Sequence, residues 1–303
     1  GLQIIGNTIG SATSANNIGL RGIVLSYSAA TTGGAIIEGN DIRVGDYGAT
    51  GYAATIAAIE VGTVNYGFII RKNNIHDVNQ PQSTGYGAHG IYITGSANNT
   101  LSTIENNFIR DVKMVIYQNS ATSAFIPCGV FFTAGVTGVN FNHNTIVMNT
   151  QLATGATFSS FCVNASVAGV RFTTFYNNIL VNNHSSTAAY GFYTAATLNI
   201  SGGAVDNNNY YVSGGHVGYY NAANRTTLAN WQTASSKDAN AENANPPFVS
   251  ATDLHLNTAG ATIANFEQQG STSAGVTTDI DGNTRPNSGT TFPDIGADEV
   301  AVA

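Results

Sequence analysis

GAHGIYITGSANNTLSTIENNFIRDV, residues 87–112, is one complete unit of a repeat that runs through most of the chain. It holds an apolar run at 89–94, a polar turn at 96–99, an alternating run at 101–106 and a third short run at 107–112. Short runs divided by Gly and Asn are typical of β-strands and turns. Three brief strands cannot bury a core alone, so neighbouring copies of the unit have to complete it.

The copies are found by aligning an asparagine that is followed two places later by Ile or Tyr. Its occurrences are Asn7, Asn40, Asn73, Asn107, Asn144, Asn177 and Asn208. The spacings between them are 33, 33, 34, 37, 33 and 31 residues. A nearly constant period of about 33, with the variation in turns, is the signature of a solenoid.

We interpret the repeated asparagine as structural. Asn tolerates the left-handed conformation at a tight bend, and its side-chain amide can hydrogen bond to the Asn of the next coil to form a ladder. The isoleucines two places later are then predicted to point inward and to stack as a column: Ile9, Ile42, Ile75, Ile109, Ile146 and Ile179.

Composition and charge exclude several classes of protein. Only 9% of the 303 residues are charged, against about 25% in an ordinary soluble domain, and this favours turns and β-structure over surface helices. The net charge of -7, without a basic cluster, argues against nucleic-acid binding. No run approaches 18 apolar residues, so we expect no direct membrane insertion.

The period narrows the fold to one kind of solenoid. Ankyrin repeats have a similar length but need two helices per unit, whereas the segments here alternate with a period of two. Leucine-rich repeats also use an asparagine, but leucine is scarce in this chain. We therefore predict an all-β parallel β-helix of about seven coils over residues 1–230. A C-terminal capping segment over 231–303 completes one continuous domain.

The coils resemble a known superfamily. The Asn-Asn-x-Ile pattern, together with HGIYIT at 89–94 and ENNFIRDV at 105–112, looks like the right-handed parallel β-helix superfamily. That superfamily includes pectate lyases, polysaccharide hydrolases, phage tailspikes and many bacterial surface proteins. The resemblance implies a single-stranded right-handed solenoid, and it does not imply an activity.

The last third of the chain resembles a second group. NPPFV at 245–249, DLHL at 253–256, DIDGNTR at 279–285 and PDIGADE at 293–299 follow in order. This series is similar to the closing segment of secreted bacterial proteins of the choice-of-anchor type, although Asn245 stands where an Asp is usual. The resemblance implies an extracellular, bacterial cell-surface or secreted location, with further domains in a longer chain.

This closing segment is predicted to cover the open core of the last coil. The covering side chains would be Phe248, Leu254, Leu256, Ile263, Phe266, Ile280, Phe292 and Ile295. Asp279, Asp281 and Asn283 have the spacing of a calcium loop, but the remaining ligands of an EF-hand are missing. The other interpretation is an Asp-Gly turn, with Arg285 paired to a carboxylate such as Asp294 or Asp298. We expect no cofactor, with calcium as the alternative.

The two cysteines, Cys128 and Cys162, lie about one repeat apart. The phase of the asparagines matches Cys128 with Phe161, which would place the two thiols on opposite faces of neighbouring strands. A disulfide needs Cβ atoms that face each other. Two buried free cysteines are therefore the preferred interpretation, and the disulfide stays open.

Polar residues cluster on the outer face of the middle coils. Glu38, Arg71 and Glu105 precede the ladder asparagine by two places, Arg43, His76 and Arg110 follow it by three, Asp77 and Asp111 follow by four, and His89 completes the cluster. As catalytic candidates we name Asp77, Asp111, Arg71, His76 and Arg110, because lyases need a base and retaining glycosidases a carboxyl pair. As ligand-binding candidates we name Glu38, Arg71, Glu105, His76 and His89.

A structural column of alternating charges explains the same residues, because like charges stacked directly repel. The predicted function is a non-catalytic, extracellular structural or adhesive module with glycans or other surface proteins as partners. A polysaccharide lyase or glycoside hydrolase acting on an acidic polysaccharide is the first alternative. The second alternative is a tailspike-like adhesin, which needs an exposed apolar flank.

Overall fold

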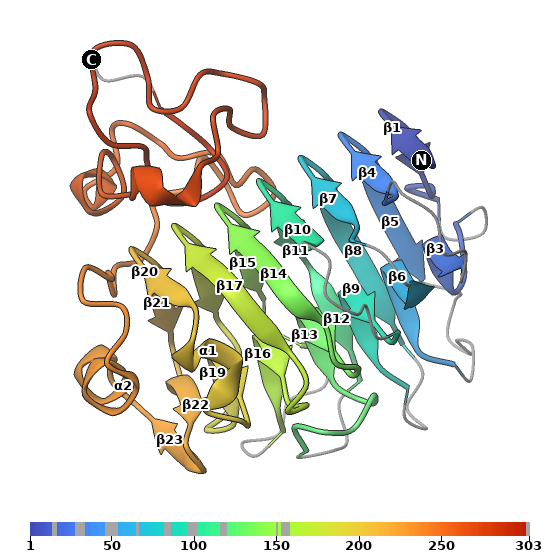
Figure 1. Ribbon diagram of the computed structural model, residues 1–303. Helices are drawn as coiled ribbons and strands as arrows, with labels where there is room; N and C mark the ends of the chain where they lie inside the picture. Colours follow the sequence, from blue (N-terminus) through green and yellow to red (C-terminus); the bar gives the residue numbers. More distant parts are fainter. Residues whose placement is uncertain are drawn as a thin grey trace.

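The structure, a computed structural model, describes residues 1–13, 17–27, 34–45, 54–64, 67–81, 86–95, 102–115, 120–149, 151–152 and 158–300. Its strands wind into a solenoid with three sheets, shown in Figure 1. The polar turn predicted at 96–99 and the last residues of the predicted cap, 301–303, lie outside the described residues.

The first sheet has seven strands in the order β1 (Gln3–Ile5), β4 (Ile36–Glu38), β7 (Ile69–Arg71), β10 (Ser102–Glu105), β14 (Thr137–Asn142), β17 (Arg171–Tyr176) and β20 (Ala204–Asp206). The second has the order β2 (Thr8–Ile9), β5 (Asp41–Gly45), β8 (Asn74–Gln80), β11 (Phe108–Arg110), β15 (Thr145–Met148), β18 (Ile179–Asn182) and β21 (Asn209–Val212), with β12 (Val112–Met114) also beside β8.

The third sheet has the order β3 (Arg21–Tyr27), β6 (Ile56–Val64), β9 (Ala88–Ile93), β13 (Pro127–Phe132), β16 (Ser160–Ala165), β19 (Ala189–Thr194), β22 (His216–Tyr220) and β23 (Ala223–Arg225). Its last pair is antiparallel. The described helices are short: α1 (Leu198–Ser201), α2 (Leu228–Ser235), η3 (Ile263–Asn265) and η4 (Thr272–Ala274).

The predicted all-β parallel solenoid is confirmed, but it has about five full turns rather than seven. The five coils from β4–β6 to β17–β19 lie between parallel neighbours on both sides, whereas the first and last coils have a parallel neighbour on one side only. Each strand therefore hydrogen bonds to its own copy about one repeat away, which is how short strands share one core.

The core contains the predicted aliphatic column, with one correction. Ile42, Ile75, Ile109 and Ile146 are fully buried and stack inside the solenoid in register. In the next coil the partner of Ile146 is Leu180 instead of Ile179. Ile179 lies one place earlier and faces outward, because successive side chains of a strand point to opposite faces.

An asparagine ladder follows one corner of the coils. Side-chain Nδ2 of each residue donates to Oδ1 of the next at 2.9–3.1 Å, through Asn7, Asn40, Asn73, Asn107, Asn144, Asn178 and Asn208. The sixth member is Asn178, so the assignment of Asn177 was wrong. The left-handed conformation, predicted at the ladder asparagine itself, belongs instead to the residue before it, with φ between 51° and 66° at Gly6, Gly39, Lys72, Asn106, His143, Asn177 and Asn207.

The end of the solenoid is closed by α2 and the residues after it. Trp231 of α2 is fully buried against the core, and its Nε1 donates to Oδ2 of Asp238 at 2.7 Å. The same carboxylate accepts from Nδ2 of Asn208 at 2.8 Å and so ends the ladder. Closure of the last coil therefore depends on residues that the sequence analysis did not select.

The rest of the C-terminal segment turns back along the side of the solenoid. Phe108, Val147, Ile179 and Val181 on the outer face of the second sheet pack against Leu254, Leu256, Phe266, Ile295, Ala297 and Val300. The prediction that apolar residues of this segment cover the end of the core was therefore wrong, because they cover the side of the solenoid. Phe292, at 50% exposure, is not part of this cluster.

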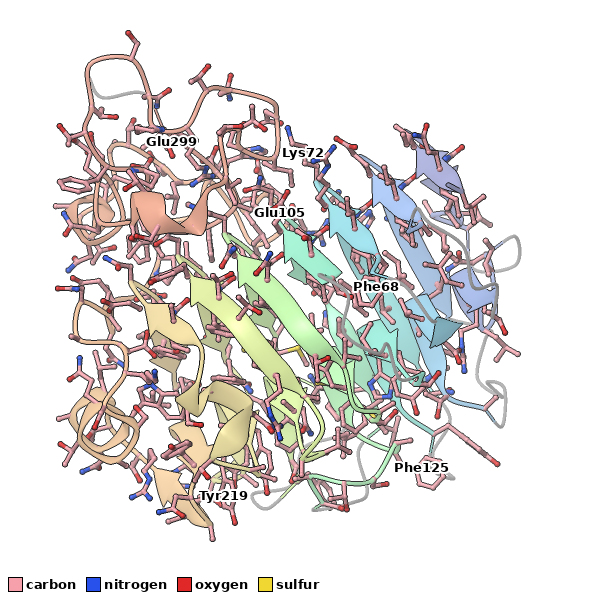
Figure 2. The ribbon with its side chains drawn as sticks, viewed as in Figure 1. Phe68, Lys72, Glu105, Phe125, Tyr219 and Glu299 are labelled. Carbon is pink, nitrogen blue, oxygen red and sulfur yellow. The ribbon has the colours of Figure 1, made fainter. Side chains whose placement is uncertain are left out.

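The corner residues fix this segment to four coils. Asn106, Asn177 and Asn207 donate through Nδ2 to backbone oxygens of Thr278, Ser271 and Gln269, and His143 Nδ1 lies 3.1 Å from Gly296 O. In Figure 2, Lys72 and Glu105 lie at the strand ends that face this segment and Glu299. Phe125 and Tyr219 lie at the opposite edge of the coils.

Cys128 and Cys162 are both buried and free. Cys128 pairs with Phe161 in the third sheet, which is the predicted register. Among the described residues, no helix has the length and apolar character needed to span a bilayer.

A candidate polar flank on the second sheet

The outer face of the second sheet changes character along the solenoid. On β15 and β18 its residues are apolar and covered by the C-terminal segment. On β5 and β8, and from Arg110 at the end of β11 through the turn and strand that follow, charged residues predominate. We call this surface the polar flank, defined by Asp41, Arg43, His76, Asp77, Arg110, Asp111 and Lys113. Its position follows from the repeat, because residues three and four places after each ladder asparagine fall on neighbouring coils.

His76 joins two carboxylates of the polar flank. Its Nε2 lies 2.8 Å from Oδ1 of Asp41 and its Nδ1 lies 2.8 Å from Oδ2 of Asp77. Arg43 also donates to Asp77 Oδ2, at 2.8 Å. The hydrogen bond from His76, with the charges of His76 and Arg43, lowers the pKa of Asp77 against the opposing effect of burial. Asp77 is therefore held as a carboxylate.

Asp111 is surrounded by donors in the same way. Arg110 Nη1 lies at 2.6 Å, Lys113 Nζ at 2.8 Å and Asn149 Nδ2 at 2.8 Å from its oxygens. Burial alone would raise the pKa of Asp111, but the hydrogen bonds from Lys113, Asn149 and Arg110 outweigh it and lower the pKa. Asp111 is also ionised.

Two cavities border these residues. One, of about 300 Å³, is lined mainly by polar groups, among them Ser11, Asn17, Arg43, Asp77, Asn79, Asp111 and Lys113. The other, of about 610 Å³, lies where the C-terminal segment meets the flank, and its lining includes Asp41, Lys72, Phe108, Asp253, His255 and Asp281. His76 lies between the two cavities, because its imidazole bonds Asp77, which lines the smaller cavity, and Asp41, which lines the larger one.

Glu38, Arg71 and Glu105 lie on the first sheet, around the ladder corner from the polar flank. Arg71 Nη2 is 2.9 Å from Glu38 Oε2, and Arg71 Nη1 is 3.8 Å from Glu105 Oε1. Burial raises the pKa of Glu105 more than Arg71 lowers it. The three side chains alternate in charge along a column, and the structure does not bring them together with Asp77 or Asp111.

His89 does not belong to the polar flank, which corrects its grouping with His76. It is fully buried on the third sheet, where its Nε2 lies 3.2 Å from the carbonyl oxygen of Ala124 and its ring lies 4.5 Å from that of Tyr92. Burial lowers the pKa of His89 to about 3. A neutral imidazole that is closed off from solvent is a packing residue.

Asp279, Asp281 and Asn283 form an Asp-Gly turn rather than a convergent set of ligands. Asp279 Oδ1 accepts the backbone N–H of Asp281 and of Asn283, and Oδ2 accepts Asn283 Nδ2 at 2.9 Å. Arg285 pairs with a carboxylate, as this interpretation predicts, but the partner is Glu299, whose Oε2 lies 3.2 Å from Arg285 Nη1, rather than Asp294 or Asp298. The acids of this segment therefore act mainly as acceptors for its own backbone.

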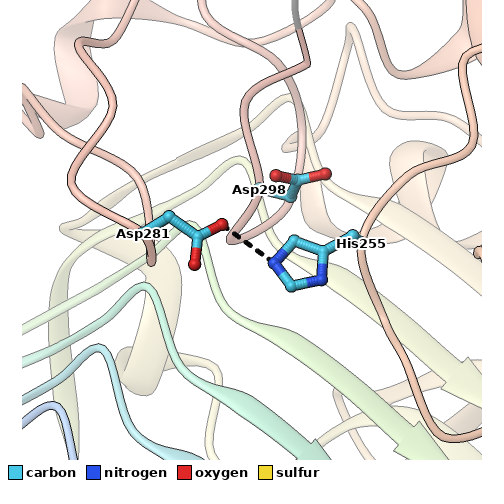
Figure 3. Close-up of side chains that lie close together, drawn as sticks. All are labelled: His255, Asp281 and Asp298. Atoms are coloured by element: carbon cyan, nitrogen blue, oxygen red, sulfur yellow. Dashed lines mark hydrogen bonds and ion pairs between the residues drawn. The ribbon is translucent and has the colours of Figure 1, made fainter.

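One cluster of possible ligands was not predicted from the sequence. His255 Nε2 lies 2.9 Å from Asp281 Oδ2, and one ligand atom each of His255, Asp281 and Asp298 lie within 4.8 Å of one another (Figure 3). Asp253 and His255 alternate in an extended run, so their common face was readable from the sequence. The approach of Asp281 and Asp298 was not, because neither lies within 20 residues of His255 in the chain.

Comparisons with known proteins add no family to this description: no family model, curated protein or solved structure matches the chain.

Proposed function

We propose that this chain is a non-catalytic structural module that lies outside a bacterial cell and binds glycans weakly along the polar flank. The observation that carries the proposal is the pairing of the flank carboxylates. Asp41, Asp77 and Asp111 each have a cationic or imidazole partner within 2.8 Å. Such groups are held in place to accept hydrogen bonds from hydroxyls.

The same pairing weighs against hydrolysis. A glycosidase needs one carboxylic acid with a raised pKa to protonate the leaving group. The pKa values of Asp77 and Asp111 are both lowered. Arg43 and Arg110, the basic residues of the flank that a lyase would use, are engaged with these carboxylates. No observation favours the enzyme over the binding module.

A tailspike-like adhesin has less support. That alternative needs an exposed apolar flank, but the apolar column of the second sheet is covered by the C-terminal segment. Among the described residues, the exposed large apolar side chains lie in the first coil, a turn and the C-terminal segment, at Leu2, Ile5, Val24, Leu152, Val249 and Phe292, and do not form one flank along the coils. The extracellular, bacterial placement rests on the resemblance of residues 245–299 to choice-of-anchor proteins.

Binding and turnover can be tested together. The protein is incubated with a panel of neutral and uronate-containing polysaccharides, with and without calcium, and bound glycan and released product are both measured. We expect retention of at least one glycan and no product. Arg43→Ala should weaken retention because it removes one of the two partners that hold Asp77, leaving only His76. Arg225 bonds the backbone of Tyr220 on the third sheet, so Arg225→Ala serves as the control.

Three results would overturn the proposal. Product release that disappears in Asp77→Asn or Asp111→Asn would indicate an enzyme. Retention that Arg43→Ala leaves unchanged would remove the polar flank as a binding surface, and so would the absence of retention of any glycan.

A further inference from the structure

We propose that His255, Asp281 and Asp298 bind a divalent transition-metal ion, of which Zn²⁺ fits the donor set best. The site lies at the junction of the C-terminal segment with the polar flank and is independent of glycan binding. Its ligands come from the extended run at 253–256, the Asp-Gly turn at 279–285 and the closing motif at 293–299. One ion would therefore cross-link three separate stretches of the segment.

The three side chains already lie close to the arrangement that a metal needs. One ligand atom from each lies within 4.8 Å of the others, and His255 Nε2 is 2.9 Å from Asp281 Oδ2. Zinc ligands lie about 2.0–2.2 Å from the ion, so in a tetrahedral site they are roughly 3–4 Å apart. Small rotations of His255 and Asp281, both partly exposed, close the difference.

The imidazole is oriented as a metal ligand usually is. Asp253 Oδ1 lies 2.5 Å from His255 Nδ1 and accepts its proton. Nε2, which donates to Asp281 Oδ2 in the metal-free protein, is then the nitrogen that binds an ion once it has lost its proton. A carboxylate behind a histidine fixes the tautomer in this way in many metal sites. The ring of Phe108 meets the imidazole edge-on at 5.0 Å between centroids and limits its rotation.

Asp298 holds the third ligand oxygen of the cluster in place. Asp298 is 6% exposed, and its Oδ2 accepts a hydrogen bond from the backbone N–H of Leu256 at 2.7 Å. Among the described residues, no hydrogen bond reaches its other oxygen, Oδ1. Figure 3 places this carboxylate beside the imidazole of His255. Oδ1 is therefore the oxygen that an ion would bind, while Oδ2 keeps its bond to Leu256.

The donor set selects the class of ion. One imidazole and two carboxylates suit zinc and neighbouring transition metals, whereas calcium takes six to eight oxygen ligands. The cavity of about 610 Å³ that opens on His255 and Asp281 gives water access to the remaining coordination position. Asp41 and Asp253 line the same cavity and favour a cation, against the single opposing charge of Lys72 among the lining residues.

The rival explanation needs no metal: a protonated His255 bonded to its carboxylates, as an ordinary ion-pair cluster. Titration of metal-free protein with ZnCl₂ by calorimetry distinguishes the two. We expect one saturable site per chain, lost in His255→Ala and weakened roughly 10–100-fold in Asp253→Asn, which acts through the histidine. His216→Ala, a half-buried histidine bonded to Thr226, is the matched control and should bind as the wild type does.

Paramagnetic Co²⁺ added to the wild-type protein keeps the test decisive if the variants do not fold. The site predicts loss of NMR signals around 253–256, 279–283 and 296–299, with a visible ligand-field band that Zn²⁺ abolishes. No saturable binding, or signal loss centred on another histidine, would overturn the proposal. Because no glycan is present, either outcome leaves the proposed function to its own test.

Discussion

A ladder asparagine in the middle of the solenoid connects three successive coils through one side chain. Asn107 Nδ2 donates to Ile70 O in the preceding coil, to Glu105 O in its own coil and to Asn144 Oδ1 in the next. Its Oδ1 accepts from Nδ2 of Asn73. Buried backbone carbonyls at a corner have no strand partner, so an amide with both donors and an acceptor satisfies them.

Removing this amide should be costly in the middle of the ladder. Asn107→Ala leaves several buried partners without hydrogen bonds, and we expect the free energy of unfolding to fall by about 3–5 kcal/mol. Urea denaturation measures the change. Asn7→Ala, at the exposed end with one neighbouring coil, should lower it by less than about 1 kcal/mol. Equal losses would show that the ladder carries no special stability.

Stability should also depend on pH through buried acids of the C-terminal segment. Burial, aided by the neighbouring Glu299, raises the pKa of Asp294 from 3.8 to about 7. The folded state then binds more protons than the unfolded state between these values. The free energy of unfolding should therefore be greatest near pH 4 and fall by up to about 4 kcal/mol towards pH 7.

Asp238 acts in the same direction, because burial raises its pKa to about 6. Asp77 and Asp111 act oppositely, since their lowered pKa values mean that stability is lost as the pH falls below about 4. Unfolding measured across this range, with Asp294→Asn as the comparison, checks the sign. A wild-type protein that gains stability from pH 4 to 7 would contradict the assignment.

The error at Asn177 shows how far a residue can be placed from sequence. Asn177 and Asn178 are chemically equivalent in the chain, and the Asn-x-Ile alignment selected the first. The structure assigns the first to the left-handed corner and the second to the ladder. Only the hydrogen bonds to the neighbouring coils separate these roles, and a single sequence does not contain them.

At the scale of elements, α2 and the C-terminal segment have separate tasks. Trp231 of α2 closes the end of the core, packing against Phe192, Tyr210 and Tyr220. The segment from 244 to 300 instead covers the apolar half of the second sheet. Period and composition predicted that the C-terminal segment packs on the coils. Whether it packs on the end or on the side of the solenoid depends on which outer residues of the coils are apolar.

Trp231→Ala should therefore expose the core at the end of the solenoid to solvent. The truncation removes a fully buried ring and leaves Asp238 without one donor, so we expect a loss of about 3–5 kcal/mol in the free energy of unfolding. An open strand edge also invites association, so light scattering should detect oligomers. Asn230→Ala, exposed in the same helix, is the control and should change neither quantity.

Phe266→Ala tests the lateral contact. This fully buried ring lies between the C-terminal segment and the second sheet. We expect hydrogen exchange to accelerate over 244–300 while the strands of the first and third sheets stay protected, because the solenoid core does not include Phe266. Uniform acceleration over all three sheets would mean that the segment and the coils unfold as one unit.

For the whole molecule, the sequence was sufficient for the architecture and insufficient for the site. A period near 33 with short alternating runs left one solenoid class, and the three sheets follow from it. The polar flank was partly predictable, because His76, Asp77, Arg110 and Asp111 lie at fixed offsets from the ladder. Grouping them with His89 and Arg71 failed, because a repeat gives the offset along the chain but not which of the three faces a residue occupies.

The most direct test of the account is the pairing of strands about one repeat apart. NMR of deuterated protein should show amide–amide contacts between the strands that contain Ile42 and Ile75, and between the strands that contain Ile75 and Ile109, as the parallel register requires. Contacts between strands adjacent in the chain, such as 56–64 with 69–71 as a hairpin, would contradict the solenoid and remove the basis for the polar flank.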